Sequence, residues 1–179
     1  MLTLVLGGAR SGKSRYAQSL CEGAGEVVFL ATARAEGDAE MRARIERHRA
    51  ERPRQWKTIE EPLAVLSAVQ QSDERAMVLL DCVTTWLANL AWEHRALPDS
   101  QREERILAEV TGLIRAADGR RVVAVSNEVG TGIVPDHPAG RSFRDLQGIA
   151  NQLLAREAGQ VVLMVAGLPL IVKQQPPSE

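Results

Sequence analysis

The sequence is poor in the features that mark membrane proteins, disulfide-stabilised proteins and nucleic-acid binders. None of its apolar runs reaches the roughly 18 residues that a membrane-spanning helix requires, and its first residues lack the basic segment of a signal peptide. Two cysteines, Cys21 and Cys82, are too few for a disulfide framework or a structural zinc site. The 22 basic and 23 acidic residues nearly balance, whereas nucleic-acid binders show a basic excess. We therefore expect a cytoplasmic protein with no nucleic-acid or membrane partner.

Repeats and flexible linkers are also lacking. No stretch rich in proline, glycine and serine divides the 179 residues, which are enough to build one full hydrophobic core. We therefore expect a single nucleotide-binding domain over residues 1–179, with a frayed tail at 174–179, where two prolines lie close to the end of the sequence.

Short apolar runs alternate with longer stretches of helical spacing. Within each run the apolar residues follow one another without polar residues between them, which is typical of strands buried on both faces of a parallel sheet. They are Leu2–Leu6, Val27–Leu30, Met77–Leu80, Val122–Val125, Val161–Val165 and Leu170–Val172. The helical stretches are Ser14–Glu22, Asp38–Arg52, Thr84–Glu93, Gln101–Ala117 and Arg141–Ala158. This order predicts an α/β fold with a mostly parallel sheet flanked by helices. A glycine- and proline-rich loop is expected at Gly130–Gly140.

The strongest motif follows the first strand directly. Gly7-Gly8-Ala9-Arg10-Ser11-Gly12-Lys13-Ser14 matches the pattern G-x-x-x-x-G-K-[ST] of a phosphate-binding loop. The glycines let the backbone curl so that its N–H groups and the new helix end point at phosphate oxygens. Lys13 supplies a cation for the β- and γ-phosphates, and the Ser14 hydroxyl is a ligand for Mg²⁺. The motif predicts nucleotide binding.

Asp81 closes the apolar run Met77–Leu80 and has two interpretations. A carboxylate at a strand end beside a phosphate loop can hold Mg²⁺, directly or through water. Alternatively, Asp81 caps the helix that follows, a role that Thr84 could also fill. The presence of a phosphate loop favours the interpretation of Asp81 as a magnesium ligand.

The predicted helix 38–52 is strongly cationic and carries His48. Residues four apart share a helix face, so Arg44, His48 and Arg52 form one stripe. A triphosphate would relieve their mutual repulsion, and neighbouring cations favour the neutral imidazole, which can attack phosphorus. A solvated charged helix is the competing interpretation. The other histidines, His94 and His137, lie in loop-like stretches and are expected to be surface residues.

Several motifs together resemble one known family, the bifunctional adenosylcobinamide kinase / adenosylcobinamide-phosphate guanylyltransferase of cobalamin biosynthesis. The resemblance covers nearly the whole chain. Its most specific parts are the His-x-x-x-Arg-Pro element at His48–Pro53 and the Asn-Glu-Val-Gly-x-Gly loop that starts at Asn127. The other parts are Gly7–Arg15, Ala31–Thr32, Trp56–Glu60, Asp81–Thr85 and Arg141–Asp145.

The resemblance implies two reactions in one chain. The first transfers a nucleotide γ-phosphate from ATP or GTP to adenosylcobinamide. The second transfers GMP from GTP to that phosphate through a covalent GMP–histidine, giving adenosylcobinamide-GDP and pyrophosphate. The matching histidine is His48. The resemblance also implies a RecA-like P-loop sheet, a trimer, and nucleotide contacts from Gly7–Ser14, Thr32, Ala33, Arg34, Arg49, Ala50, Glu51, Arg52, Glu60 and Asp81.

Two other functions compete with this interpretation. One is a simpler P-loop kinase of a small metabolite, for which His48 is a surface residue. The other is a non-catalytic GTP-binding switch, although the sequence has no N-K-x-D element to read guanine.

Overall fold

The computed structural model describes residues 1–34, 46, 49–50 and 52–175. A seven-stranded sheet forms its centre, in the order β3-β2-β4-β5-β1-β6-β7. All neighbours are parallel except β6 and β7, which form an antiparallel hairpin. The strands are β1 (Leu2–Gly7), β2 (Val27–Ala31), β3 (Lys57–Glu60), β4 (Met77–Asp81), β5 (Arg121–Asn127), β6 (Gln160–Val165) and β7 (Leu168–Gln174). The predicted α/β fold, a mostly parallel P-loop sheet flanked by helices, is confirmed.

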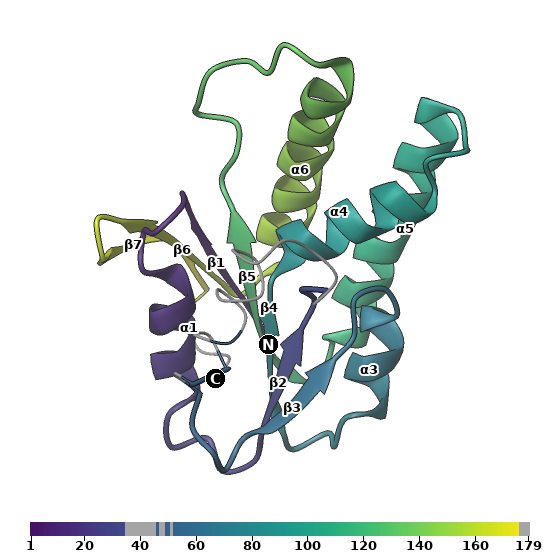
Figure 1. The fold of residues 1–179 in the computed structure, drawn as a ribbon. Coiled ribbons are helices and arrows are strands. Elements are labelled where there is room, and N and C mark those ends of the chain that lie inside the picture. Colours follow the sequence, from purple (N-terminus) through teal and green to yellow (C-terminus); the bar gives the residue numbers. More distant parts are fainter. Residues whose placement is uncertain (35–45, 47–48, 51, 176–179) are drawn as a thin grey trace.

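Helices cover both faces of this sheet unequally (Figure 1). One face packs α1 (Lys13–Cys21), together with Trp56 from the segment before β3. The other face packs α3 (Val65–Gln71), α4 (Val83–Glu93), α5 (Asp99–Ala116) and α6 (Pro138–Glu157). Each central strand therefore buries side chains on both faces, which explains why its sequence reads as an unbroken apolar run.

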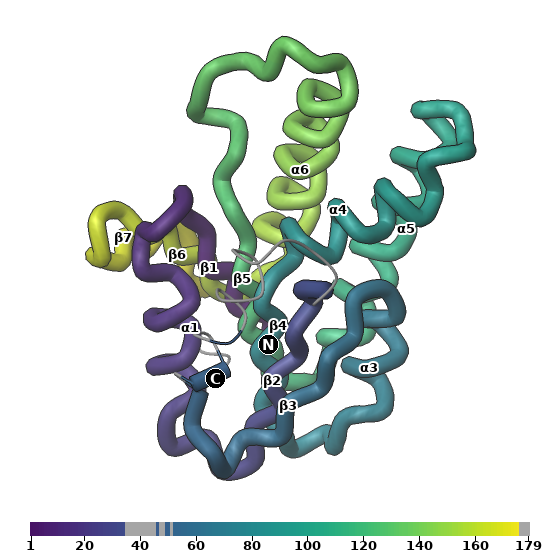
Figure 2. Tube along the Cα trace, in the orientation of Figure 1, coloured from purple at the N-terminus to yellow at the C-terminus, as the bar shows by residue number. Residues whose placement is uncertain are grey.

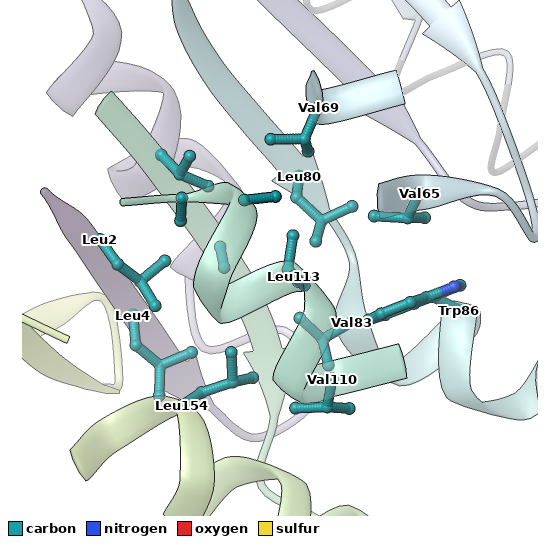
Figure 3. Close-up of a cluster of buried hydrophobic side chains, with 14 of the residues drawn as sticks. Leu2, Leu4, Val65, Val69, Leu80, Val83, Trp86, Val110, Leu113 and Leu154 are labelled. Atoms are coloured by element: carbon teal, nitrogen blue, oxygen red, sulfur yellow. The ribbon is translucent and has the colours of Figure 1, made fainter. Parts of the chain in front are cut away.

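The larger core layer lies under the four helices. Leu4 and Leu80 of the sheet meet Trp86 of α4 and Leu113 of α5, all of them fully buried (Figure 3). The indole Nε1 of Trp86 donates a hydrogen bond of 2.9 Å to the carbonyl of Leu63, so even this large side chain leaves no polar atom unpaired. This layer fixes α4 and α6 against the sheet.

Two short elements were missed by the sequence prediction. β3 contains one apolar residue, Ile59, because it is an edge strand with exposed neighbours, so it shows no apolar run. α3 has seven residues and buries only Val65 and Val69. The predicted helix over 38–52 falls mostly outside the described residues.

Two predicted boundaries are wrong. The loop expected to end at Gly140 ends at His137, because α6 begins with Pro138, and His137 caps it by accepting a hydrogen bond from the Ala139 N–H at 3.2 Å. Proline suits a first helical position, where its missing N–H is not needed. The tail does not fray from residue 174: Gln174 belongs to β7, and the N–H of Gln175 bonds the Gly159 carbonyl at 2.8 Å.

Candidate active site

The residues predicted to bind nucleotide gather at one edge of the sheet. Six parallel strands end there, and the last residues of five of them are Gly7, Ala31, Glu60, Asp81 and Asn127. Ligand sites of open α/β sheets lie outside the carboxyl ends of the strands, where the loops that follow the strands converge. Figure 2 shows that the chain after β5 also rises from this edge before it returns as α6. The sheet thus brings together motifs that are up to 120 residues apart (Gly7 to Asn127).

The phosphate loop has the tight backbone that its glycines require. Gly12, directly before α1, has φ +91°, in the left-handed region that favours glycine. At Gly7, an added Cβ would collide with Ser11 Oγ and would lie 3.0 Å from the Met164 carbonyl oxygen. Neither position accepts a larger residue without displacing the loop.

Neighbouring elements hold this loop from both sides. The N–H of Glu128, after β5, donates to the Gly7 carbonyl at 3.0 Å. The N–H of Gly167, in the β6–β7 turn, donates to the Ser11 carbonyl at 3.0 Å. Gly8, Ala9 and Arg10 remain exposed at the top of the loop. The loop is therefore held in shape before any ligand binds.

Lys13 and Ser14 open α1 beneath the loop. The Lys13 side chain is buried, and its ammonium donates to the Gly8 carbonyl at 2.9 Å, so it lies across the loop rather than in solvent. Ser14 is half-buried. Ser11 Oγ is buried and has no hydrogen-bond partner within the described part of the chain. A loop with a buried ammonium and an unpaired buried hydroxyl beside a helix start suits an anion.

Thr32 joins the ends of β2 and β4. Its buried hydroxyl donates to the Cys82 carbonyl at 2.8 Å and accepts from the Cys82 N–H at 2.9 Å. Asn89 of α4 donates to the Thr32 carbonyl at 2.8 Å. The Thr32 hydroxyl is thus fully engaged inside the protein, and the next two residues, Ala33 and Arg34, are half-buried.

Asp81 does not cap the helix that follows it. The cap position of α4 is Cys82, and no side chain makes a capping hydrogen bond there. The Thr84 hydroxyl instead accepts from the N–H of Asn127 at 2.8 Å. Neither Asp81 nor Thr84 therefore occupies the N-cap position of α4, and Asp81 is half-buried at the end of β4.

A pocket of about 390 Å³ opens on the α1 face beside β3. Its lining residues are Arg49, Arg52, Pro53, Arg54, Trp56, Thr58 and Glu60. Arg49 and Glu60 form an ion pair at its rim, where each side chain is 47% exposed. Ala50, next to Arg49, is exposed. The pocket offers a carboxylate and guanidinium groups to a polar ligand.

Arg52 is the unusual group of this pocket. Its guanidinium lies 3.8 Å from the centroid of the Phe29 ring, and its Nε and Nη1 atoms are buried without a hydrogen-bond partner among the described residues. Burial lowers the pKa of Arg52, while the carboxylates of Asp81 and Glu60 oppose that shift. Buried N–H donors without acceptors are costly, so a bound anion would satisfy them.

Two predicted site residues, His48 and Glu51, lie outside the described residues, as does Arg44 of the predicted cationic stripe. The two other histidines are described: His94 follows the last residue of α4 and His137 caps α6. One contributor was missed from sequence, because the Phe29 ring under Arg52 gives no local signal. Asn127 was singled out only as the start of a family motif, with no role of its own.

Comparisons with known proteins match this chain to one family over nearly its full length. A sequence model of the family described as cobinamide kinase / cobinamide phosphate guanyltransferase matches residues 3–172. The chain is 41% identical over 182 residues to the bifunctional adenosylcobalamin biosynthesis protein CobU of Escherichia coli, covering 97% of this chain and 100% of that one. It is 42% identical over 181 residues to the bifunctional adenosylcobalamin biosynthesis protein CobP of Pseudomonas aeruginosa, covering 98% and 99%. The corresponding CobU of Salmonella typhimurium is 39% identical over 189 residues, covering 97% and 100%.

Proposed function

The chain belongs to the cobinamide kinase / cobinamide phosphate guanyltransferase family, and on that premise we propose which of its residues carry the two reactions. It is an enzyme of cobalamin biosynthesis with kinase and guanylyltransferase activities. The full-length family match carries this conclusion. A one-reaction kinase or a non-catalytic GTP switch does not fit a chain whose relatives are bifunctional from end to end.

The kinase step uses the phosphate loop. The bond between the γ-phosphorus and the β–γ bridging oxygen of ATP or GTP breaks, a bond to the hydroxyl oxygen of adenosylcobinamide forms, and the hydroxyl proton passes to water. The loop N–H groups of Gly7–Ser14 and the Lys13 ammonium stabilise the charge that develops on the phosphates. Support comes from the buried Lys13 side chain, which crosses the loop at 2.9 Å from the Gly8 carbonyl.

Substitution of Lys13 tests this role. Lys13→Ala should lower the rate of cobinamide phosphorylation at least about a hundredfold, because a charge-stabilising donor is removed from the transition state. Lys57→Ala is the matched control, since Lys57 is exposed at the opposite end of the sheet, where β3 begins. A Lys13→Ala enzyme that works at the rate of the control would refute the assignment.

Magnesium suits the oxygen donors beside the loop. The Ser14 hydroxyl and the Asp81 carboxylate are hard ligands of the kind that Mg²⁺ prefers. The described residues contain no group of three or more His, Cys, Asp or Glu side chains that could hold a metal ion, which fits an ion that takes its remaining ligands from phosphates and water. Bound Mg²⁺ would neutralise charge on the β- and γ-phosphates. Ser14 and Asp81 hold it, Asp81 directly or through water.

The guanylyl step uses His48. Its neutral imidazole nitrogen attacks the α-phosphorus of GTP, the bond to the α–β bridging oxygen breaks, and pyrophosphate leaves. A phosphate oxygen of adenosylcobinamide phosphate then attacks the same phosphorus, the P–N bond breaks, and adenosylcobinamide-GDP forms. The nucleotide in this step is contacted by Arg34, Arg49, Ala50, Glu51, Arg52 and Glu60, and Thr32 and Ala33 lie beside it. The unpaired guanidinium N–H groups of Arg52 support an anion at this place.

Labelling identifies the nucleophile. Incubation with α-labelled GTP should give an acid-labile protein adduct, which His48→Ala abolishes and the control His94→Ala keeps. An adduct that persists in His48→Ala would mean that another side chain carries the nucleotide.

A trimer in the cytoplasm is the state that we infer for this enzyme. The family resemblance supports the trimer, and so does the exposed apolar edge strand β7, where Leu168, Leu170 and Val172 are 57–71% exposed. No helix in the described part of the chain is long and apolar enough to cross a membrane. The cytoplasm is the compartment that supplies nucleoside triphosphates as substrates. Light scattering should give a mass three times the 19.5 kDa of one chain; a monomer would contradict the trimer.

A further inference from the structure

Strand β5 separates the phosphate loop from Asp81. It lies between β1 and β4 in the sheet, with Asn127 in register with Gly7 and Val125 in register with Asp81. Asn127, the last residue of β5, therefore extends two residues beyond the level of Asp81 and stands beside the start of the phosphate loop. No role has been assigned to it so far.

The side chain of Asn127 points to the face that carries α1 and the phosphate loop. Side chains alternate along a strand. Val123 and Val125 pack in the layer under α1, whereas Ala124 packs in the opposite layer and Ser126 bonds Asn151 and Gln147 of α6 there. The Asn127 side chain is half-buried, and its amide makes no hydrogen bond within the described part of the chain.

The backbone of Asn127, in contrast, is held from both flanking helices. Its N–H donates to Thr84 Oγ1 of α4 at 2.8 Å, and its carbonyl accepts from Asn151 Nδ2 of α6 at 3.1 Å. The next N–H, of Glu128, bonds the Gly7 carbonyl at 3.0 Å. The end of β5 is thus tied to α4, to α6 and to the phosphate loop.

A buried polar cluster stands behind these bonds. Ser126 Oγ donates to Asn151 Oδ1 at 2.7 Å, and Gln147 Nε2 lies 3.0 Å from each of those two oxygens. Ser126 and Gln147 are fully buried, in a layer that is otherwise apolar. Burying such groups is costly and gives no packing that leucine or valine would not give. What the cluster adds is a fixed position for the end of β5.

Resting on the function proposed above, we propose that the side-chain amide of Asn127 donates a hydrogen bond to the transferred γ-phosphoryl group in the kinase step. As the bond to the β–γ bridging oxygen breaks and the bond to the cobinamide hydroxyl forms, negative charge spreads over the three equatorial oxygens of that group. A neutral donor whose backbone is already fixed stabilises this charge without reorganising. Thr84 and Asn151 act as positioning residues for Asn127.

Four substitutions, two at Asn127 and two at Thr84, test the proposal. Asn127→Ala should lower kcat for cobinamide phosphorylation about 10- to 100-fold, with less than a threefold change in KM for the nucleotide, because the contact forms chiefly in the transition state. The isosteric Asn127→Asp removes the donor while keeping the shape, and it should lose at least as much. Thr84→Val removes the acceptor for the Asn127 N–H and should lower kcat by a smaller factor. Thr84→Ser keeps that acceptor, so its kcat should equal that of wild type.

Thermal unfolding separates a role in chemistry from a role in stability. The Asn127→Ala midpoint should stay within about 2 °C of wild type, because the side chain makes no hydrogen bond in the described part of the protein. Wild-type kcat in Asn127→Ala or Asn127→Asp would overturn the proposal, and so would a loss of activity that merely follows a fall in the midpoint. A wild-type enzyme that forms no cobinamide phosphate would instead refute the proposed function itself.

Discussion

Replacement of Gly12 by alanine probes the shape of the phosphate loop. Gly12 has φ +91° and ψ +3°, a conformation in which a Cβ costs roughly 1–2 kcal/mol. The new Cβ would also lie 3.3 Å from Gly167 Cα, whose backbone N–H holds the loop at Ser11. For a protein of this size, each kcal/mol shifts the unfolding midpoint by about 2–4 °C, so Gly12→Ala should lower the midpoint by about 2–8 °C.

Circular dichroism melts without nucleotide measure this effect, with Gly8→Ala as the control from the same loop. Gly8 has no positive φ, and a Cβ there would meet no atom within 4 Å, so its midpoint should stay within about 1 °C of wild type. Gly12→Ala should also weaken the binding of a non-hydrolysable GTP analogue, measured by calorimetry, because the N–H groups of the loop are displaced. Equal midpoints for the two variants would refute the reasoning.

Three further predictions concern the pocket and the core. Glu60→Gln removes the exposed ion pair with Arg49, so stability should change by less than about 1 kcal/mol, while calorimetry should show about tenfold weaker GTP binding; unchanged affinity would contradict a nucleotide contact. Burial raises the pKa of the Cys21 thiol from 9.0 to about 11; the unfolded chain loses this proton first, so Cys21 should contribute a fall in stability of about 2 kcal/mol between pH 9 and 11. In urea melts the fall for Cys21→Ala should be smaller than that of wild type by this amount, while the pKa of Cys82, which burial also raises, lowers the stability of both proteins in the same direction. Trp86→Phe removes the hydrogen-bond donor of the half-buried Leu63 carbonyl and opens a cavity, so it should cost about 2–4 kcal/mol in urea unfolding; a loss below 1 kcal/mol would show that the site relaxes.

Much of the sheet was predictable because its central strands are buried on both faces. Runs such as Leu2–Leu6 and Met77–Leu80 carry their own signal, and the structure extends them by only a residue at the end. β3 could not be found this way, since an edge strand with the sequence Lys57-Thr58-Ile59-Glu60 offers one apolar side chain. The start of α6 is predictable from sequence, because a proline directly after a capping residue, here Pro138 after His137, is a helix-start signal.

The candidate site divides in the same way. The phosphate loop is contiguous in sequence, so its residues and chemistry followed from one motif. The pocket at Arg52 depends on the Phe29 ring and on Glu60, which come from β2 and β3; the cationic stripe predicted an anion near Arg52, but only the family resemblance pointed to Glu60. The position of Asn127 depends on the insertion of β5 between β1 and β4, and strand order of that kind cannot be predicted from local patterns.

The central claim is that one chain performs both transfers on one corrinoid. It is tested most directly by incubating the purified enzyme with adenosylcobinamide and GTP labelled at either the α- or the γ-phosphorus, and by separating the products by thin-layer chromatography. We predict that γ-label first appears in adenosylcobinamide phosphate, that both labels then appear in adenosylcobinamide-GDP, and that unlabelled pyrophosphate is released when the α-labelled nucleotide is used. A corrinoid product that acquires γ-label but never α-label would contradict the account.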